Sequence, residues 1–232
     1  MPKIIAGLDL GTNNIRGAVV KIDGKNRIEL IGVDTIPSNG IECGTVVNLE
    51  LASREVNNLL TRLERKTGRR IKRVSAVVSD PMVEGIEANG MIALGNRPRQ
   101  VSSRDIEKCL KAASMVNIPE DRYVVLKNIT GYYVNEWEKV LNPMDLFATK
   151  LGIKAYIVSI RISRLENLRK CIEHTGCILE NCVFSPRAVL EAAYVPDETD
   201  LRPMIMDIGC SSTSLTAFNG TSVVFASNID AG

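Results

Sequence analysis

The sequence has little of what common metal and enzyme sites require. It holds one histidine, His174, and six cysteines without a C-x-x-C pair. The P-loop, G-x-G-x-x-G, G-x-S-x-G and H-E-x-x-H patterns are all missing, which removes the usual signatures of nucleotide-dependent, hydrolytic and zinc enzymes. The cysteines near His174 have poor spacing for zinc, so we expect buried thiols that a reducing compartment keeps free.

Long apolar runs and a strong excess of one charge are missing too. Nowhere do eighteen apolar residues run together, and the first apolar run reaches Asp9 too soon to form the core of a signal peptide. A formal net charge of +2 gives no global attraction to nucleic acid or to a membrane. The 45% of hydrophobic residues can bury the core of one or two domains. We therefore expect a folded cytoplasmic protein with no nucleic-acid partner.

The pattern at the start of the chain predicts three strands, a helix and a fourth strand. Asn48 is a favourable N-cap, and apolar residues recur on one helical face from Ala52 to Leu63, so we expect the helix to end near Gly68. The β-rich runs are separated by turn residues, and the last run stops at Asp80 before a proline. The predicted strands cover residues 4–9, 15–22, 27–36 and 73–79.

The sequence pattern changes from residue 82 to about residue 161. These residues contain a β segment punctuated by glycine, a helix that Ser102 or Ser103 opens, and further strands, which indicates an inserted small α/β module. The first pattern then resumes, before a charged linker leads into a final strand. The resumed pattern predicts a helix, a strand and a helix at 163–175, 178–184 and 187–195.

Two stretches of the chain share one pattern. Residues 4–14 (I-I-A-G-L-D-L-G-T-N-N) and 203–213 (P-M-I-M-D-I-G-C-S-S-T) each carry an apolar run that meets Asp, one apolar residue, Gly and small polar residues. A hairpin turn of this kind exposes backbone N–H groups and hydroxyls, and glycine has no Cβ to bar a phosphate. The Asp would repel the phosphate unless a divalent cation or its bound water lies between them. Two such hairpins across a cleft therefore predict a clamp for a nucleoside triphosphate with Mg²⁺.

The L-D-L-G-T and D-I-G motifs resemble those of the actin-like ATPase superfamily, and within it the chain is similar to the FtsA family of bacterial cell-division proteins. Residues 32–50 and 142–158 resemble further FtsA segments. The resemblance implies an α/β, actin-like (ribonuclease H-like) ATPase fold with an inserted small α/β subdomain and an incomplete second lobe. The implied units are a first-lobe core at 1–81 and 162–198, the FtsA-type insert at 82–161, and the start of the second lobe at 199–232.

The resemblance also implies a site for ATP and Mg²⁺. Asp9 and Asp207 would hold Mg²⁺ through water, and the tips of both hairpins would contact the nucleotide. The residues that the resemblance assigns to the cofactor are Asp9, Gly11, Thr12, Asn13, Asn14 and Arg16 in the first hairpin, and Asp207, Gly209, Cys210, Ser211, Ser212 and Thr213 in the second.

Members of the FtsA family bind ATP, polymerise, and tether the tubulin-like division-ring protein to the membrane through a C-terminal amphipathic helix. The resemblance therefore implies several partners: the ring protein, other proteins of the division machinery, and further copies of the chain in filaments. It also implies a position at the inner face of the cell membrane. No catalytic residue is assigned, and the nucleotide is expected to act as an assembly switch.

The chain departs from the family pattern at several positions of the site. In the second hairpin Cys210 and Ser211 replace glycines and Ser214 replaces an Asp, so added Cβ atoms narrow the room for phosphate. In the first hairpin Asn14 stands where a Lys is common, and Arg16 could supply the charge instead. Ser185 replaces the acid that orients the attacking water in many actin-like ATPases. We therefore expect modest nucleotide binding and at most a weak ATPase.

The sequence ends soon after the second hairpin, and it is therefore expected to be truncated relative to the family. In relatives, the subdomain that holds adenine and the membrane-binding segment lie farther along. We accordingly expect these 232 residues to bind ATP poorly, and the hairpin over 204–225 to be short of sheet partners.

Two other functions remain open on the same fold. A PilM-like protein of type IV pilus assembly would grip a partner's peptide with the insert and first lobe, although the segment at 32–50 argues against it. A sugar or acetate kinase would need a catalytic base, and Asp80 is the candidate, although Asp before proline is more simply a turn residue.

Two surface features also have open alternatives. The run at 62–73 holds seven basic residues, which either touch anionic lipid or nucleic acid, or form a solvated helix end that complements the helix dipole. Tyr132, Tyr133 and Trp137 in the insert are either a docking patch for a partner or alternately buried strand residues.

Overall fold

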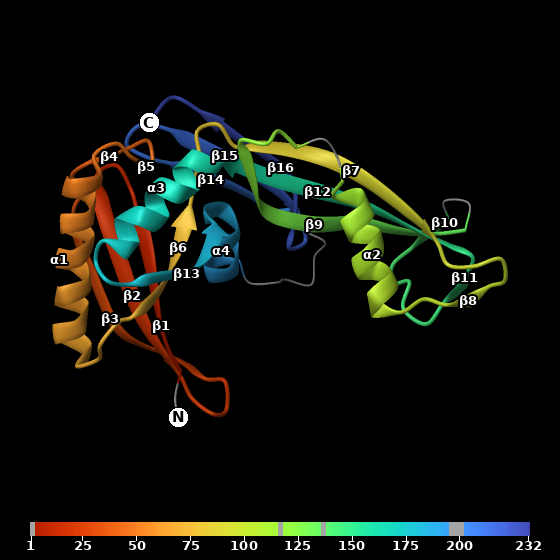
Figure 1. Ribbon diagram of the computed structural model, residues 1–232, viewed down its shortest axis with the longest axis horizontal. Helices are drawn as coiled ribbons and strands as arrows, with labels where there is room; N and C mark the ends of the chain where they lie inside the picture. Colours follow the sequence, from red (N-terminus) through yellow and green to blue (C-terminus); the bar gives the residue numbers. More distant parts are fainter. Residues whose placement is uncertain (1–2, 116–117, 136–137, 195–201) are drawn as a thin grey trace.

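The computed structural model describes residues 3–115, 118–135, 138–194 and 202–232. Within these residues the chain forms a core of sheet and helices, an elongated insert that extends away from the core, and a small sheet that lies against both (Figure 1). The α/β architecture with an inserted module is confirmed.

A five-stranded sheet forms the centre of the core, in the order β13-β6-β1-β2-β3. The first three strands form an antiparallel meander, and β6 and β13 add to its other edge in parallel. The meander and the later strands were all predicted from the sequence and are confirmed. The strands are β1 (Lys3–Leu10), β2 (Asn14–Ile22), β3 (Ile28–Pro37), β6 (Arg73–Val78) and β13 (Ile178–Phe184).

Two helices, α1 (Leu49–Thr67) and α3 (Ile162–Glu173), pack against one face of this sheet. The side chain of Asn48 accepts a hydrogen bond from the Leu51 N–H at 3.0 Å, and Gly68 ends α1 in the left-handed conformation with φ of 62°. Both predicted ends of α1 are therefore confirmed. Its predicted apolar face is buried throughout: Ala52, Val56, Leu59, Leu60 and Leu63.

A short hairpin of β4 (Ile41–Glu42) and β5 (Thr45–Val46) precedes α1. Its turn needs two positive φ angles, 46° at Cys43 and 65° at Gly44. The hairpin packs beside α3 near the carboxyl ends of β1 and β6.

The insert is a four-stranded antiparallel sheet in the order β10-β9-β12-β7, with α2 (Ser103–Ala113) on one face. Of the two serines that the sequence offered as the start of α2, Ser102 is the N-cap. Of the three aromatic residues singled out in the insert, Tyr132 and Tyr133 are half-buried on β9, and Trp137 lies outside the described residues. The strands are β7 (Glu84–Ala93), β9 (Arg122–Val134), β10 (Glu138–Val140) and β12 (Lys150–Arg161), with a small ladder of β8 (Arg99–Gln100) and β11 (Phe147–Ala148) at the far end.

Helix α4 (Ser185–Ala193) begins two residues before the predicted start at 187. Pro186 lies in its first turn, where the fixed φ of proline suits a helix and no N–H is needed. The predicted end at 195 lies outside the described residues.

The last three strands form a small antiparallel sheet, β14 (Met204–Ile208), β15 (Thr213–Asn219) and β16 (Ser222–Ile229). The sequence predicted that the hairpin over 204–225 is short of sheet partners, and among the described residues its sheet consists of these three strands alone, with β14 and β16 at the edges. Phe218 and Val223 are buried against the insert, where the Tyr156 hydroxyl accepts a hydrogen bond from the Ala226 N–H at 3.1 Å. In the described part of the chain, no helix has the length and apolar character that crossing a bilayer requires.

Candidate functional site

The two Asp-Gly stretches fold into turns of the same backbone geometry. The Gly11 N–H donates to the carbonyl oxygen of Asn14 at 3.1 Å, and the Gly209 N–H donates to that of Ser212 at 2.9 Å. A Cβ on either glycine would lie 2.9 Å from that same carbonyl oxygen, so each turn requires glycine at its first position. The repeated motif of the sequence is therefore a repeated structure.

The two acidic residues occupy equivalent places in these hairpins. Asp9, next to last in β1, lies opposite Arg16 on β2, and Asp207, next to last in β14, lies opposite Ser214 on β15. The second hairpin thus repeats the first with one difference in charge, since an arginine faces the first carboxylate and a serine faces the second.

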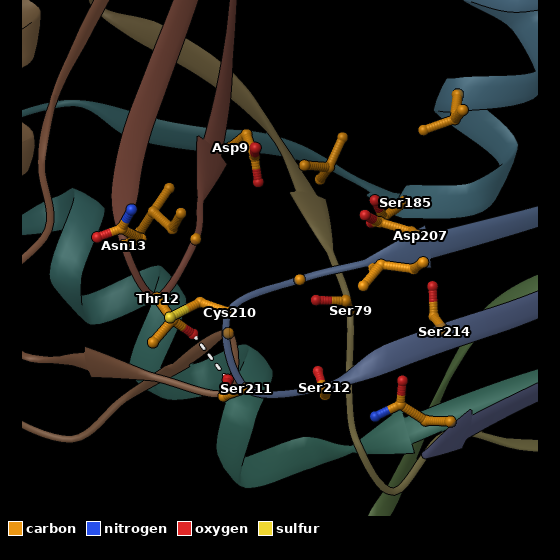
Figure 2. Close-up of a pocket in the computed structure, with 18 of the residues that line it drawn as sticks. Asp9, Thr12, Asn13, Ser79, Ser185, Asp207, Cys210, Ser211, Ser212 and Ser214 are labelled. Atoms are coloured by element: carbon orange, nitrogen blue, oxygen red, sulfur yellow. Dashed lines mark hydrogen bonds between the residues drawn. The ribbon is translucent and has the colours of Figure 1, made fainter. Parts of the chain in front are cut away.

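Both hairpins line one cleft of about 910 Å³. Figure 2 shows the side chains of Asp9 and Asp207 reaching toward this space from strands on either side of it. All of the residues that the sequence assigned to the cofactor line the cleft except Thr213, whose hydroxyl donates to the carbonyl oxygen of Ala231 at 2.6 Å. The structure therefore brings together two groups of residues that lie about two hundred positions apart in the sequence.

A side-chain contact joins the tips of the two hairpins. The hydroxyl oxygens of Thr12 and Ser211 lie 3.2 Å apart, drawn as a dashed line in Figure 2. The neighbouring Cys210 is exposed, which contradicts the expectation that the thiols are buried, whereas Cys109, Cys171 and Cys177 fit it. Cys210 is exposed because it lies in the turn of the second hairpin rather than on a packed strand.

Arg16 is paired within its own hairpin. Its Nη1 lies 3.1 Å from Oδ2 of Asp9, and the two side chains are 57% and 45% exposed. An ion pair this exposed contributes at most about 1 kcal/mol, so it can open when an anion or cation arrives. Asp207, by contrast, has no basic group within 4.0 Å among the residues that the structure describes.

The floor of the cleft includes residues that the sequence did not assign. Ser79 follows β6, beside the end of β1, and Ser185 begins α4; both line the cleft (Figure 2). Gly44 packs against Ser79, since a Cβ on Gly44 would lie 2.9 Å from the Ser79 hydroxyl oxygen. The adjacent carboxyl ends of parallel strands are a general place for ligands, and that rule could have identified Ser79.

Asp80 also lies beside the cleft, but its carboxylate is fully engaged. Its side chain is 0% exposed and pairs with Arg164 Nε at 3.1 Å. It also accepts hydrogen bonds from the Met82 N–H at 2.8 Å and the Arg161 N–H at 3.0 Å. Asp80 thus holds together the two segments by which the chain leaves the core and returns to it, and these contacts account for its buried carboxylate.

Comparisons with known proteins agree with this geometry. Residues 82–159 match the family model of the SHS2 domain inserted in FTSA. The cell division protein FtsA of Pseudomonas aeruginosa is 27% identical over 216 residues, covering 93% of this chain and 51% of that protein. FtsA of Borreliella burgdorferi is 26% identical over 215 residues, covering 93% of this chain and 52% of that protein. The resemblance to FtsA that the motifs predicted is confirmed.

A solved structure gives the same result for the fold. A chain of the PilM-PilN type IV pilus biogenesis complex superposes with a TM-score of 0.64 at 17% sequence identity, covering 97% of this chain and 61% of that chain. The fold is the actin-like ATPase fold. The chain spans about half the length of the curated relatives it matches.

Proposed function

Since the chain is a relative of the FtsA cell-division proteins and has the actin-like ATPase fold, we propose that it is a cytoskeletal cell-division protein that binds ATP with Mg²⁺ in the cleft between the two hairpins. The observation that carries this proposal is the repeated turn, which brings the residues of two glycine turns, with their hydroxyls and two carboxylates, to the lining of one cleft. We further propose the division into a core at 1–81 and 162–198, an insert at 82–161 and a second-lobe segment at 199–232.

The residues present fit the phosphate end of a nucleotide. A cleft of about 910 Å³ falls within the usual range for small-molecule sites, roughly 300 to 1,000 Å³. Thr12, Ser212 and Ser214 offer hydroxyls there, and the absence of a Cβ at Gly11 and Gly209 lets a phosphate approach the backbone of the turns. Such donors suit phosphate oxygens, and carboxylates suit the water shell of a hard cation.

Of the two carboxylates, Asp207 is the more available for Mg²⁺, because no cation is paired with it among the described residues. Asp9 already shares its charge with Arg16, whereas Asp207 faces Ser214. When bound, Mg²⁺ would offset the negative charge of the phosphates, and Asp207 would orient its water ligands. Arg16 would leave Asp9 for a phosphate oxygen, because an exposed ion pair costs little to break.

Calorimetric titration of the full chain with ATP, in Mg²⁺ and in EDTA, tests this proposal. We expect weak binding that Mg²⁺ strengthens, because Cβ atoms at Cys210 and Ser211 narrow the second turn. Asp207→Asn should remove most of the gain from Mg²⁺, about tenfold in affinity or about 1.4 kcal/mol, and Asp9→Asn should remove less. Asp145→Asn, an exposed position in the insert, is the matched control and should change nothing. Binding that is equally tight in EDTA and indifferent to Asp207→Asn would show that the phosphates lie elsewhere.

Little ATP hydrolysis is proposed. Ser185 stands where an acid would orient water, and the Asp80 carboxylate beside the cleft is buried in its own contacts. This arrangement also disfavours a sugar or acetate kinase, for which a phosphotransfer assay on a panel of sugars is the test. We expect no transfer above background.

The partners proposed are the tubulin-like ring protein, other division proteins and further copies of the chain, at the inner face of the cell membrane. The likeness to the pilus complex is one of fold, at 17% identity, and does not favour a pilus role. A pull-down with the purified ring protein beside the purified pilus partner separates the two functions. Capture of the pilus partner alone would overturn the division role.

A further inference from the structure

The small sheet of β14, β15 and β16 contacts two distant parts of the molecule (Figure 1). At one end, the turn between β14 and β15 lines the cleft, and Ser211 at its tip contacts Thr12 of the first hairpin. Toward the other end, β16 lies against the insert strands β7, β9 and β12. The two ends are about 23 Å apart, because the seven residues of β15 each rise about 3.3 Å. One sheet therefore connects the cleft with the insert.

Two hydrogen bonds and an apolar cluster fasten this sheet to the insert. The Tyr156 hydroxyl accepts a hydrogen bond from the Ala226 N–H at 3.1 Å, and the Asn128 side-chain amide donates to the carbonyl oxygen of Val223 at 3.3 Å. Phe218 and Val223 are 1% and 0% exposed in the cluster that includes Tyr156. Directional bonds inside an apolar cluster fix the position of the sheet on the insert.

The backbone on both sides is shaped for this contact. A Cβ at Gly85 in β7 would overlap the hydroxyl of Tyr156, so the tyrosine ring occupies space that only a glycine leaves open. On the side of the small sheet, a register shift in the pairing of β15 with β16 allows both Val223 and Ala226 to be buried, although they are three positions apart. The contact is therefore specific in its geometry.

The core holds the insert at a second place, beside the floor of the cleft. Ser79 lines the cleft, and the next residue, Asp80, accepts hydrogen bonds from both segments that connect the core with the insert. The guanidinium of Arg122 donates to the carbonyl oxygens of Met82 and Ser159, at 2.9 and 3.4 Å, and so joins the same two segments. The insert is thus held by the core at its base and by the small sheet on its face.

We propose that the small sheet couples the cleft to the insert, with Tyr156 as the residue that positions the sheet on the insert. The strands of the sheet are paired along their length, so they move as one body. A change in the separation of the two hairpin tips therefore tilts the sheet and disturbs its contact with Tyr156. A ligand in the cleft would change the insert by the same route. That last step rests on the proposed nucleotide site, whereas the coupling of the two contacts does not.

Hydrogen exchange of the full chain, followed by mass spectrometry, tests the coupling without a ligand. Thr12→Val removes the contact at the cleft, and we expect exchange over residues 84–89 and 222–229 to become about threefold faster or more. Exchange in α1 is the internal reference, because a general loss of stability would increase it equally. Thr35→Val, at an exposed position of β3, is the matched control and should leave exchange in the insert unchanged.

Tyr156→Phe tests the coupling from the other end of the sheet. The change keeps the ring and removes the hydroxyl that accepts the Ala226 N–H. We expect faster exchange at the cleft turn, residues 208–213, and a double variant with Thr12→Val in which the two effects are not independent. Sites this far apart would otherwise act independently. Tyr132→Phe, in the cluster that packs against α2, is the matched control and should leave the cleft turn unchanged.

ATP with Mg²⁺ provides a third measurement. In the wild type, ATP should slow exchange in both hairpins and in β7, whereas in Tyr156→Phe it should slow exchange in the hairpins alone. Calorimetry on the same samples reports whether ATP is bound. Failure to bind would count against the proposed nucleotide site, and the two variants without ligand would still decide the coupling.

Three results would overturn the coupling. Exchange in β7 and β16 of Thr12→Val that matches the wild type would mean that the sheet transmits nothing. An equal increase in α1 would mean that the variant only lowers the stability of the whole chain. Bound ATP that protects the hairpins and leaves β7 of the wild type unchanged would mean that the insert does not respond to the cleft.

Discussion

The hydroxyl oxygens of Thr12 and Ser211 lie 3.2 Å apart, and this hydrogen bond joins the tips of the two hairpins across the cleft. The two residues are 199 positions apart in the sequence, so the contact connects the β1–β2 hairpin with the β14–β15 hairpin.

Removing one hydroxyl of the pair should destabilise the chain slightly. Thr12→Val keeps the shape of the side chain and loses the hydrogen bond, for an expected cost of about 1 kcal/mol in the free energy of unfolding. Urea unfolding of Thr12→Val, Ser211→Ala and the double variant should give a coupling of about 0.5 to 1 kcal/mol. Thr221→Val, at an exposed turn, is the control. Strictly additive effects would mean that the two hydroxyls do not interact.

Much of the local structure could be predicted from the sequence because it depends on local chemistry. Asn48 and Gly68 fixed the ends of α1 through capping and a positive φ, and the Asp-Gly motifs marked both hairpin turns. Periodic apolar residues identified the buried face of α1. The resemblance to FtsA then supplied the order in which these elements assemble.

The rest depended on contacts between distant residues. The pairing of Asp9 with Arg16 follows from the register of β1 and β2, which the length of the turn sets. Asp80 accepts a hydrogen bond from the Arg161 N–H, where the chain returns from the insert to the core. Strand β16 is held in place by apolar packing against the insert. No periodicity or motif reports such contacts, so the sequence predicts the turn at Asp80, which the structure confirms, but not the contacts of its carboxylate with Arg161 and Arg164. The cofactor roles of the cleft residues stay predictions.

The two connections between core and insert should depend on Asp80. Replacing this buried carboxylate by Asn leaves Arg164 without its partner, and we expect a loss of about 3 kcal/mol in the free energy of unfolding. Urea unfolding measures the loss, and faster proteolysis near residues 82 and 161 would locate it. Asp121→Asn, an exposed position in the adjoining turn, is the control. If Asp80→Asn instead left stability unchanged and abolished phosphotransfer to a sugar, the kinase alternative would be correct.

The close packing of α2 on the insert sheet should require glycine at position 90. A Cβ at Gly90 would lie 2.4 Å from the Ala113 nitrogen and 2.6 Å from the Cys109 carbonyl oxygen. Both are backbone atoms of α2, which cannot move away by a rotamer change as a side chain can. Gly90→Ala should therefore push the helix away and cost about 2 kcal/mol, lowering the melting temperature by about 4 to 8 °C. The control is Gly7→Ala in β1, where nothing lies within 4 Å of the added Cβ. A Gly90→Ala variant as stable as this control would contradict the close approach of α2.

The start of α2 should make the insert sensitive to acid. Both Nη atoms of Arg99 donate to the Asp105 carboxylate at 2.8 Å, and the Ser102 N–H and hydroxyl donate to it at 3.0 and 2.6 Å. These contacts, with Arg99 the largest contributor, hold the pKa of the buried Asp105 well below its usual range, although burial opposes them.

A carboxylate whose pKa is lower in the folded than in the unfolded state adds stability above the unfolded value, about 3.9, and loses it as the pH falls through the folded value. Asp105→Asn should therefore cost about 2 kcal/mol at neutral pH, and its difference from the wild type should shrink below about pH 4. Urea unfolding at several pH values measures this difference, with Glu107→Gln on the exposed side of α2 as the control. A difference that stayed constant down to pH 3 would mean that the charge of Asp105 is not what stabilises the helix start.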